Sequence, residues 1–352
     1  MVKDMDNNTE NKQITIYDIA KEAGVSASTV SRVLTNNANV RPEKKEKVQA
    51  IIDKYNFRPN AFAKGLSDTR SNLIGIITAD VRNPFYSAVF VACENAARER
   101  GYRVLLCNSL GEGSREIDEL HMLVQQRVDA IIQLGGRVDD IVTDPTYAEE
   151  TRKIVSTIPM VVNGKIDGVN AYSVRIDAKE ACSLLAEHLI QLGHERIALV
   201  GGRLDVISTY EKYVTYRDVL KEHDIEFRDS YVVTGGYDQD TGYKGVKQLL
   251  GLKEIPTAII AINDFAAAGV VRGLQEMGFN VPNDISVVSY DNTYITHLMA
   301  PKLTSIDYDY DNFGKIMIDT AIAAMESKES VPPVQMVKPN LVVRKSSGTA
   351  KR

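Results

Sequence analysis

The chain has 352 residues, of which 44% are hydrophobic and 25% are charged, a composition typical of a globular protein longer than one ordinary domain. No apolar run is long enough to span a bilayer and residues 1–13 hold no hydrophobic signal region, so we expect a cytoplasmic protein that makes no use of a membrane. The cysteines Cys93, Cys107 and Cys182 are widely spaced in apolar settings, which predicts buried free thiols without metal-ligand spacing.

The net charge of −5 conceals a difference between the beginning of the chain and the rest. Residues 1–70 carry twelve Lys or Arg against nine Asp or Glu, whereas the remaining residues carry thirty against thirty-eight. A basic segment on an acidic body suits a small nucleic-acid-binding module attached to a domain that binds something else.

Three short helices are predicted in this basic segment. Thr15 can cap the first with help from Asp18, Gly24 predicts its end, and Ser26 can cap the second after a very short turn. Pro42 predicts the start of the third helix. The expected core comprises Ile16, Ile19, Ala20, Ala23, Val30, Val33, Leu34, Val48, Ile51, Ile52 and Tyr55. Two short helices joined by a tight glycine turn are the signature of a helix-turn-helix.

The second helix, GVSASTVSRVL, begins with small hydroxyl and methyl side chains, which suit a close approach to base edges in the DNA major groove. Ser and Thr can bond to bases or phosphates, Ala can contact a thymine methyl group, and Arg32 can reach guanine or phosphate. The alternative is a solvated helix face with a capped start. The residues predicted to contact DNA here are Thr15, Tyr17, Ser26, Ala27, Ser28, Thr29, Ser31, Arg32 and Asn36.

The next segment, residues 60–70, contains a short helical pattern that Asn60 can cap and that runs to about Leu66. A helix of this length is marginal in isolation. One interpretation is a plain interdomain linker. The other is a hinge that becomes helical on DNA, with Asn60 and Ala63 against the DNA and Leu66 wedged into the minor groove.

From residue 73 onward, apolar runs alternate with helical segments, a pattern that predicts parallel sheets with helical crossovers. The runs are LIGIIT, RVLLCN, DAIIQL, PMVVN, RIALVGG, AIIAIN and ISVVSY. Ligands of such folds bind beyond the carboxyl ends of the strands. Residues 80–86, 201–213, 263–264 and 290–292 are therefore expected around one cleft.

Several stretches resemble the LacI-GalR (lactose-repressor) family of bacterial transcription regulators, from Thr15 to about Arg344. They are TIYDIAKEAGVSASTVSRVLTNN, RPNAFAKGLS, LIGIITADVRNPFY, GHERIALVGG, PTAIIAINDFAAAG and DISVVSYDNT. The resemblance implies a small all-α helix-turn-helix head (14–59), a hinge helix or linker (60–70) and a two-lobed α/β body (71–346). That body would be periplasmic-binding-protein-like with parallel sheets. Lobe 1 would span about 72–170 plus 309–336, and lobe 2 about 171–306 plus 338–346.

The resemblance also implies an effector site between the lobes. Asp291 matches a position that binds effector hydroxyls, and Phe85 and Tyr86 match positions where some members stack a ligand ring. A structural aspartate at a strand end and a core aromatic pair are the respective alternatives. Family members commonly carry an arginine where this chain has Lys212, so the effector itself is not implied. The predicted effector contacts are Asp80, Asn83, Phe85, Tyr86, Lys212, Asn263, Asp264 and Asp291. For Asn263 and Asp264 the alternative is that one binds the ligand while the other caps the next helix.

The resemblance and the residues together predict a transcriptional repressor that binds near-palindromic operator DNA as a homodimer. Its effector would be a small molecule, with a sugar preferred, and the helix after Phe85 and the segment 310–325 would form dimer contacts. No pattern of catalytic residues, dinucleotide-binding glycines or metal ligands occurs, so no enzyme activity, cofactor or metal is expected. The alternatives are control by a protein corepressor, or a sugar-binding module whose head is vestigial. The effector, the operator and the direction of the response stay open.

Overall fold

The computed structural model describes residues 14–34, 40–57, 70–326 and 331–351, which form two compact units, residues 1–71 and 72–352. The first unit contains α1 (Ile16–Ala23), α2 (Ala27–Leu34) and α3 (Pro42–Lys54). The predicted capping box is confirmed, because the Thr15 amide donates to Asp18 (2.9 Å) and the Asp18 amide donates to Thr15 Oγ1 (3.3 Å). Gly24 ends α1 in the left-handed conformation, with φ 66°, as expected.

The core of the first unit is built mainly from the predicted residues. Ile19, Val30 and Val48 are fully buried, and the other apolar positions pack around them. Tyr55 is an exception, since 39% of it is exposed. It lies at the C-terminal cap of α3 with the Lys54 ammonium 4.7 Å from its ring centroid, and the core is completed by Phe57 instead.

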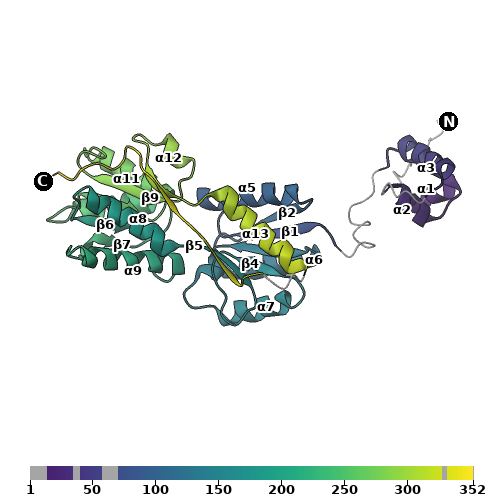
Figure 1. Ribbon diagram of the computed structural model, residues 1–352, viewed down its shortest axis with the longest axis horizontal. Coiled ribbons are helices and arrows are strands. Elements are labelled where there is room, and N and C mark those ends of the chain that lie inside the picture. Colours follow the sequence, from purple (N-terminus) through teal and green to yellow (C-terminus); the bar gives the residue numbers. More distant parts are fainter. Residues whose placement is uncertain (1–13, 35–39, 58–69, 327–330, 352) are drawn as a thin grey trace, which may run out of the picture. The chain divides into compact units, whose positions relative to one another are not determined.

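The second unit contains two sheets, each forming one lobe (Figure 1). The strand order of the first sheet is β11-β5-β4-β3-β1-β2, and every pairing in it is parallel. Its strands are β1 (Leu73–Thr78), β2 (Arg103–Asn108), β3 (Ala130–Leu134), β4 (Met160–Val162), β5 (Tyr172–Ile176) and β11 (Val334–Val337). Its helices are α5 (Pro84–Glu99), α6 (Gly113–Gln125), η1 (Gly136–Asp139), α7 (Pro145–Val155) and α13 (Tyr310–Met325).

The second sheet has the order β12-β10-β9-β8-β6-β7 and is parallel except for β12, which pairs antiparallel with β10. Its strands are β6 (Ile197–Val200), β7 (Val232–Val233), β8 (Ala258–Ala261), β9 (Ser286–Tyr290), β10 (Thr304–Asp307) and β12 (Asn340–Val342). Its helices are α8 (Ala178–Gln191), α9 (Ile207–Glu222), η2 (Asp229–Tyr231), α10 (Gln239–Leu250), α11 (Asp264–Glu276) and α12 (Ile295–Leu298). The predicted two-lobed α/β architecture is thus confirmed.

The chain crosses between the lobes three times, after β5, after β10 and after β11. The first crossing was expected at residues 170–171, and this boundary is wrong. Residues 172–176 form β5, which pairs with β4 and β11 and buries Val174 in the first lobe. Lobe 1 therefore extends to about residue 176, and lobe 2 begins with α8.

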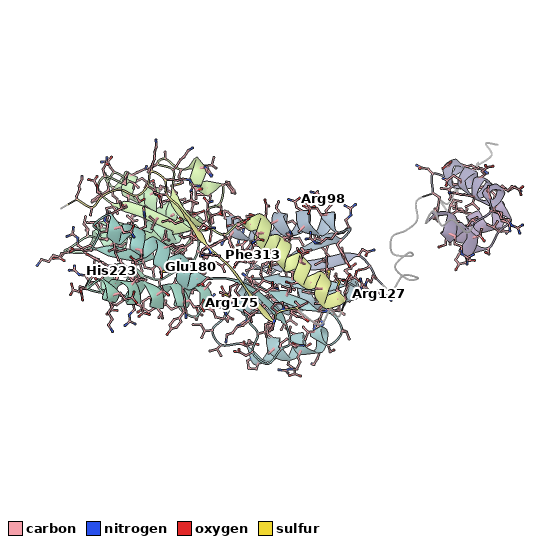
Figure 2. All side chains as sticks on the ribbon, in the orientation of Figure 1. Arg98, Arg127, Arg175, Glu180, His223 and Phe313 are labelled. Carbon is pink, nitrogen blue, oxygen red and sulfur yellow. The ribbon has the colours of Figure 1, made fainter. Side chains whose placement is uncertain are left out.

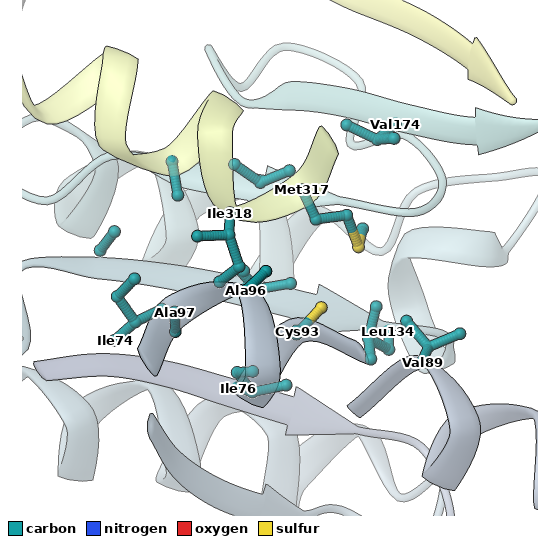
Figure 3. Packing of buried hydrophobic residues seen from close by; sticks show 14 of the residues in the cluster. Ile74, Ile76, Val89, Cys93, Ala96, Ala97, Leu134, Val174, Met317 and Ile318 are labelled. Carbon is teal, nitrogen blue, oxygen red and sulfur yellow. The ribbon is translucent and has the colours of Figure 1, made fainter. Parts of the chain in front are cut away.

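The first lobe is closed on one face by α5 and α13, which come from opposite ends of the body (Figure 1). The two helices approach closely at Gly314, where an added Cβ would lie 2.5 Å from the carbonyl carbon of Ala92. Beneath them the fully buried side chains of Cys93, Met317 and Ile318 meet the sheet (Figure 3). All three cysteines are free and buried, as predicted.

The second lobe depends on an equally close approach between α10 and α11. At Gly269 an added Cβ would lie 1.8 Å from the Gln239 carbonyl oxygen, which is backbone and cannot rotate away. We therefore expect Gly269→Ala to lower the free energy of unfolding of the body by roughly 1–3 kcal/mol, measured by urea denaturation of the full chain. The matched control is Gly251→Ala at the end of α10, where the nearest atom lies 3.4 Å away, so no loss is expected.

Candidate functional site

The first unit presents a hydroxyl-rich surface at the start of α2. Ser26 Oγ lies 2.8 Å from Ser28 Oγ and 2.9 Å from Thr29 Oγ1, and it accepts a hydrogen bond from the Thr29 amide (3.3 Å). Tyr17 is 73% exposed. Of the residues predicted to contact DNA, those exposed are Thr15, Tyr17, Ser26, Ser28, Ser31 and Arg32, while Ala27 and Thr29 are half-buried. Asn36, Asn60, Ala63 and Leu66 lie outside the described residues.

The second unit contains a cleft of about 770 Å³ between its lobes, at the carboxyl ends of strands from both sheets. This volume is in the range of small-molecule sites. Seven of the eight predicted effector contacts line it, namely Asp80, Asn83, Phe85, Tyr86, Lys212, Asn263 and Asp291. The strand-end rule therefore located the cleft correctly, although whether these side chains touch a ligand stays a prediction.

The aromatic wall of the cleft is formed by α5 and the segment after β10. Asn83 caps α5 by accepting a hydrogen bond from the Phe85 amide (3.1 Å), which fixes the direction of the two rings that follow. The Phe85 ring packs edge-on against Tyr86 (5.2 Å between centroids) and Tyr308 (6.1 Å). Phe85 therefore belongs both to the cleft wall and to the packing between the lobes.

Asp264 does not line the cleft, which corrects the expectation that it contacts the effector. Its carboxylate is 1% exposed and accepts hydrogen bonds from the hydroxyls of Ser289 and Ser305 and from the amide and hydroxyl of Thr293. It ties β9 and β10 to the start of α11. Asn263 caps α11 by accepting from the Ala266 amide (2.7 Å) and lines the cleft as well.

Lys212 and Asp291 are two buried ionisable side chains that line the cleft. The Lys212 Nζ atom lies 3.9 Å from the centroid of the Tyr290 ring. Burial lowers the pKa of Lys212, while the negative charge of Asp291 opposes this effect. Burial raises the pKa of Asp291, and the charge of Asp264 raises it further. Asp291 also has a φ of 98°, a strained backbone held by a hydrogen bond from the Tyr310 hydroxyl to its carbonyl oxygen (2.7 Å).

Several residues that line the cleft were not predicted from the sequence: Arg137, Asp139, Asp140, Asn163, Arg175 and Tyr237. Asp139 and Asn163 follow β3 and β4, so the strand-end rule applied to DAIIQL and PMVVN would have found them. Arg175 lies within β5, a strand that the sequence analysis missed. Tyr237 lies in the connection after β7, where no local pattern marks it.

Polar contacts join the two lobes across the cleft. Asp139 of η1 accepts a hydrogen bond from the hydroxyl of Ser208 on α9 (2.8 Å). Arg175 of β5 forms an ion pair with Glu211 of α9 at 2.9 Å, and Figure 2 labels Arg175 at the edge of the first lobe. The Ile141 amide donates to the Asp205 carbonyl (2.9 Å). Two of these three contacts between the described lobes, Asp139–Ser208 and Arg175–Glu211, are therefore made by side chains that also line the cleft.

Buried carboxylates predict how the stability of the body depends on pH. Burial raises the pKa of Glu116 from 4.5 to about 7, although its carboxylate accepts bonds from Gln133 (2.8 Å) and the Arg137 amide (3.1 Å). The folded state then binds the proton more tightly than the unfolded chain, so this group's contribution to stability is present below pH 4.5 and is lost as the pH rises to 7. Glu116→Gln should flatten the dependence in this window, measured as melting temperature against pH. An unchanged slope would contradict this role.

A helical head with an exposed hydroxyl-rich helix, joined in one chain to a two-lobed body with a central cleft, is the arrangement of a DNA-binding regulator that carries a separate small-molecule cleft. Comparison with known proteins agrees with this class. Residues 15–60 match the model "Bacterial regulatory proteins, lacI family", and residues 186–347 match "Periplasmic binding protein-like domain". The chain belongs to the lacI family of bacterial regulatory proteins.

Individual relatives support the same assignment. Catabolite control protein A of Priestia megaterium is 36% identical over 90% of this chain and 94% of its own length. The HTH-type transcriptional repressor PurR of Pectobacterium carotovorum subsp. carotovorum (strain PC1) is 31% identical over 94% and 96%. A solved lac repressor dimer bound to operator and the anti-inducer ONPF superposes with a TM-score of 0.86 at 29% identity, covering 96% of this chain and all of that one.

This protein is accordingly a DNA-binding transcriptional regulator of the repressor type, and these relatives are regulators, not enzymes. Within the described ranges, the structure contains no group of three or more potential metal ligands. Among the same residues, no helix is both long and apolar enough to cross a membrane.

Proposed function

We propose that this regulator binds a near-palindromic operator as a homodimer and that a carbohydrate effector in the cleft controls its affinity for DNA. The observation that carries the effector class is the combination of aromatic rings and buried carboxylates around one 770 Å³ cavity. Sugar rings pack against aromatic faces, while carboxylates accept hydrogen bonds from sugar hydroxyls. Asp291 would accept effector hydroxyls, and Phe85 and Tyr86 would contact the ring.

The dimer proposal is supported by the structural relative that is itself a dimer on its operator. The helices α5 and α13 lie side by side on the first lobe, and α5 exposes 51% of Val91. A partner lobe packed there would set the distance between two heads. An effector that changes how the lobes meet would then change operator affinity, and operator would change effector affinity by the same factor.

The test is a thermal-shift screen of the full chain against monosaccharides, disaccharides, sugar phosphates and nucleobases, followed by operator titration with each hit. A true effector raises the melting temperature by mass action and changes the operator affinity. A hit that leaves operator affinity unchanged would contradict control through the cleft. A blank screen with intact operator binding would favour control by a protein corepressor.

Arg32 provides a test of the DNA surface. We expect Arg32→Ala to weaken binding to a selected operator by about 1–3 kcal/mol if the guanidinium reads a base. Fluorescence anisotropy with operator and scrambled duplexes at one salt concentration measures this loss. An equal loss on both duplexes would assign Arg32 to a phosphate contact instead. Arg272→Ala on α11 of the second lobe, away from the head and from the proposed dimer surface, is the matched control and should leave both affinities unchanged.

A further inference from the structure

The charges that line the cleft are unevenly balanced. Five basic side chains face seven acidic ones. The basic residues are Arg82, Arg137, Arg175, Arg203 and Lys212, and the acidic residues are Asp80, Asp139, Asp140, Glu211, Asp238, Asp240 and Asp291. A cleft with this excess of carboxylates repels an anion before any specific contact forms.

Every arginine of this set is ion-paired with a carboxylate. Arg82 pairs with Asp80 (2.8 Å), Arg137 with Asp140 (3.4 Å) and Arg203 with Asp205 (2.8 Å). The fourth pair, Arg175 with Glu211, is the most enclosed, because the two side chains are only 22% and 25% exposed. A phosphate group would have to displace a carboxylate from one of these guanidinium groups and leave that carboxylate beside it.

The remaining cation, Lys212, does not offer an anion site either. It is 9% exposed and its Nζ atom lies over the Tyr290 ring. The carboxylates of Asp291 and Asp139 both act electrostatically on its ammonium group. An anionic ligand that reached Lys212 would therefore meet these two carboxylates in the same enclosed space.

We propose that the cleft selects an uncharged polyhydroxylated ligand over its phosphorylated form, and that Glu211 determines this specificity by occupying the guanidinium of Arg175. The proposal rests on the proposed function of the cleft as an effector site. Glu211 projects from α9 of the second lobe onto Arg175 of β5 in the first, so the pair is made only when the lobes meet. Replacing Glu211 by glutamine removes the charge of this side chain and keeps its shape. The guanidinium of Arg175 would then be free to donate two parallel hydrogen bonds to phosphate oxygens.

The experiment compares inorganic phosphate and hexose 6-phosphates with chloride and the unphosphorylated hexoses, at equal ionic strength, by thermal shift and calorimetry on the full chain. The proteins are wild type, Glu211→Gln, Arg175→Gln, the double variant that combines these two changes, and the control Glu222→Gln at the exposed end of the same helix. Because a DNA-binding head is expected to bind phosphate as well, only the binding that Arg175→Gln abolishes is attributed to the cleft.

We expect wild type and Glu222→Gln to show no Arg175-dependent binding of phosphate or hexose 6-phosphate. Glu211→Gln should bind these anions at least about tenfold more tightly, and the double variant should lose the gain. Arg175-dependent anion binding by wild type, measured against the single variant Arg175→Gln, would overturn the proposal even if Glu211→Gln did not fold. A folded Glu211→Gln protein without the gain would also overturn it. Neither result depends on operator DNA, so the proposed function is tested separately.

Discussion

Asp264→Ala is expected to lower the free energy of unfolding of the two-lobed body by on the order of 3–5 kcal/mol. The carboxylate is fully enclosed and accepts hydrogen bonds from Ser289, Ser305 and Thr293. Its removal leaves these buried donors without an acceptor and cuts the link between β9, β10 and α11. Urea denaturation of the full chain, followed by circular dichroism, measures the loss.

Two variants distinguish this role from a general effect of removing a carboxylate. Asp264→Asn keeps the shape but replaces one acceptor oxygen by a donor, so an intermediate loss is expected. Asp218→Ala, on the exposed face of α9, should change stability by no more than about 0.5 kcal/mol. A loss for Asp264→Ala as small as that for Asp218→Ala would contradict the structural role and return Asp264 to the effector contacts.

The head could be predicted from the sequence because its determinants are local. The Thr15–Asp18 capping box, Gly24 and Pro42 each act within a few residues, and the structure has all three where they were expected. The central strands of the body were equally accessible, since buried parallel strands are continuous apolar runs. Asp80, Asn263 and Asp291 follow such runs, so the rule that sites lie at strand ends located the cleft.

The remaining features depend on contacts between distant segments. β5 has a mixed pattern, YSVRI, and β11 is largely exposed, so neither shows the apolar run that identified the other strands. Arg175 could not be recognised as a cleft residue because its partner, Glu211, belongs to the other lobe. From the sequence, Asn263 and Asp264 were equally good candidates for effector contacts, because both follow the same apolar strand. Only the packing of Ser289, Thr293 and Ser305 around one of them separates the buried carboxylate from the cleft residue.

The largest effect on ligand binding is expected from Asp291→Asn. If two effector hydroxyls donate to this carboxylate, the loss of charge removes roughly 3–5 kcal/mol, or about two to three orders of magnitude in affinity. Stability should change in the opposite direction. Burial and the neighbouring charge of Asp264 raise the pKa of Asp291 to about 8, so near neutral pH folding requires this carboxyl to take up a proton, which lowers the stability of the folded body. An uncharged amide of the same shape avoids this cost.

The two readouts are melting temperature without ligand and calorimetric affinity for the effector found in the screen. Asp291→Asn should melt at a higher temperature than wild type at pH 7.5, and the difference should shrink as the pH falls toward 3.8, where the carboxyl is protonated in the unfolded chain as well. Asn263→Asp is a useful contrast at the end of β8, the strand next to β9 in the same lobe, because it keeps the capping oxygen of α11 and adds a charge to the cleft. A less stable Asp291→Asn protein with unchanged effector affinity would mean that Asp291 serves the fold. A more stable protein that no longer responds to its effector would mean that the strained, buried carboxylate is kept for binding, at the expense of stability.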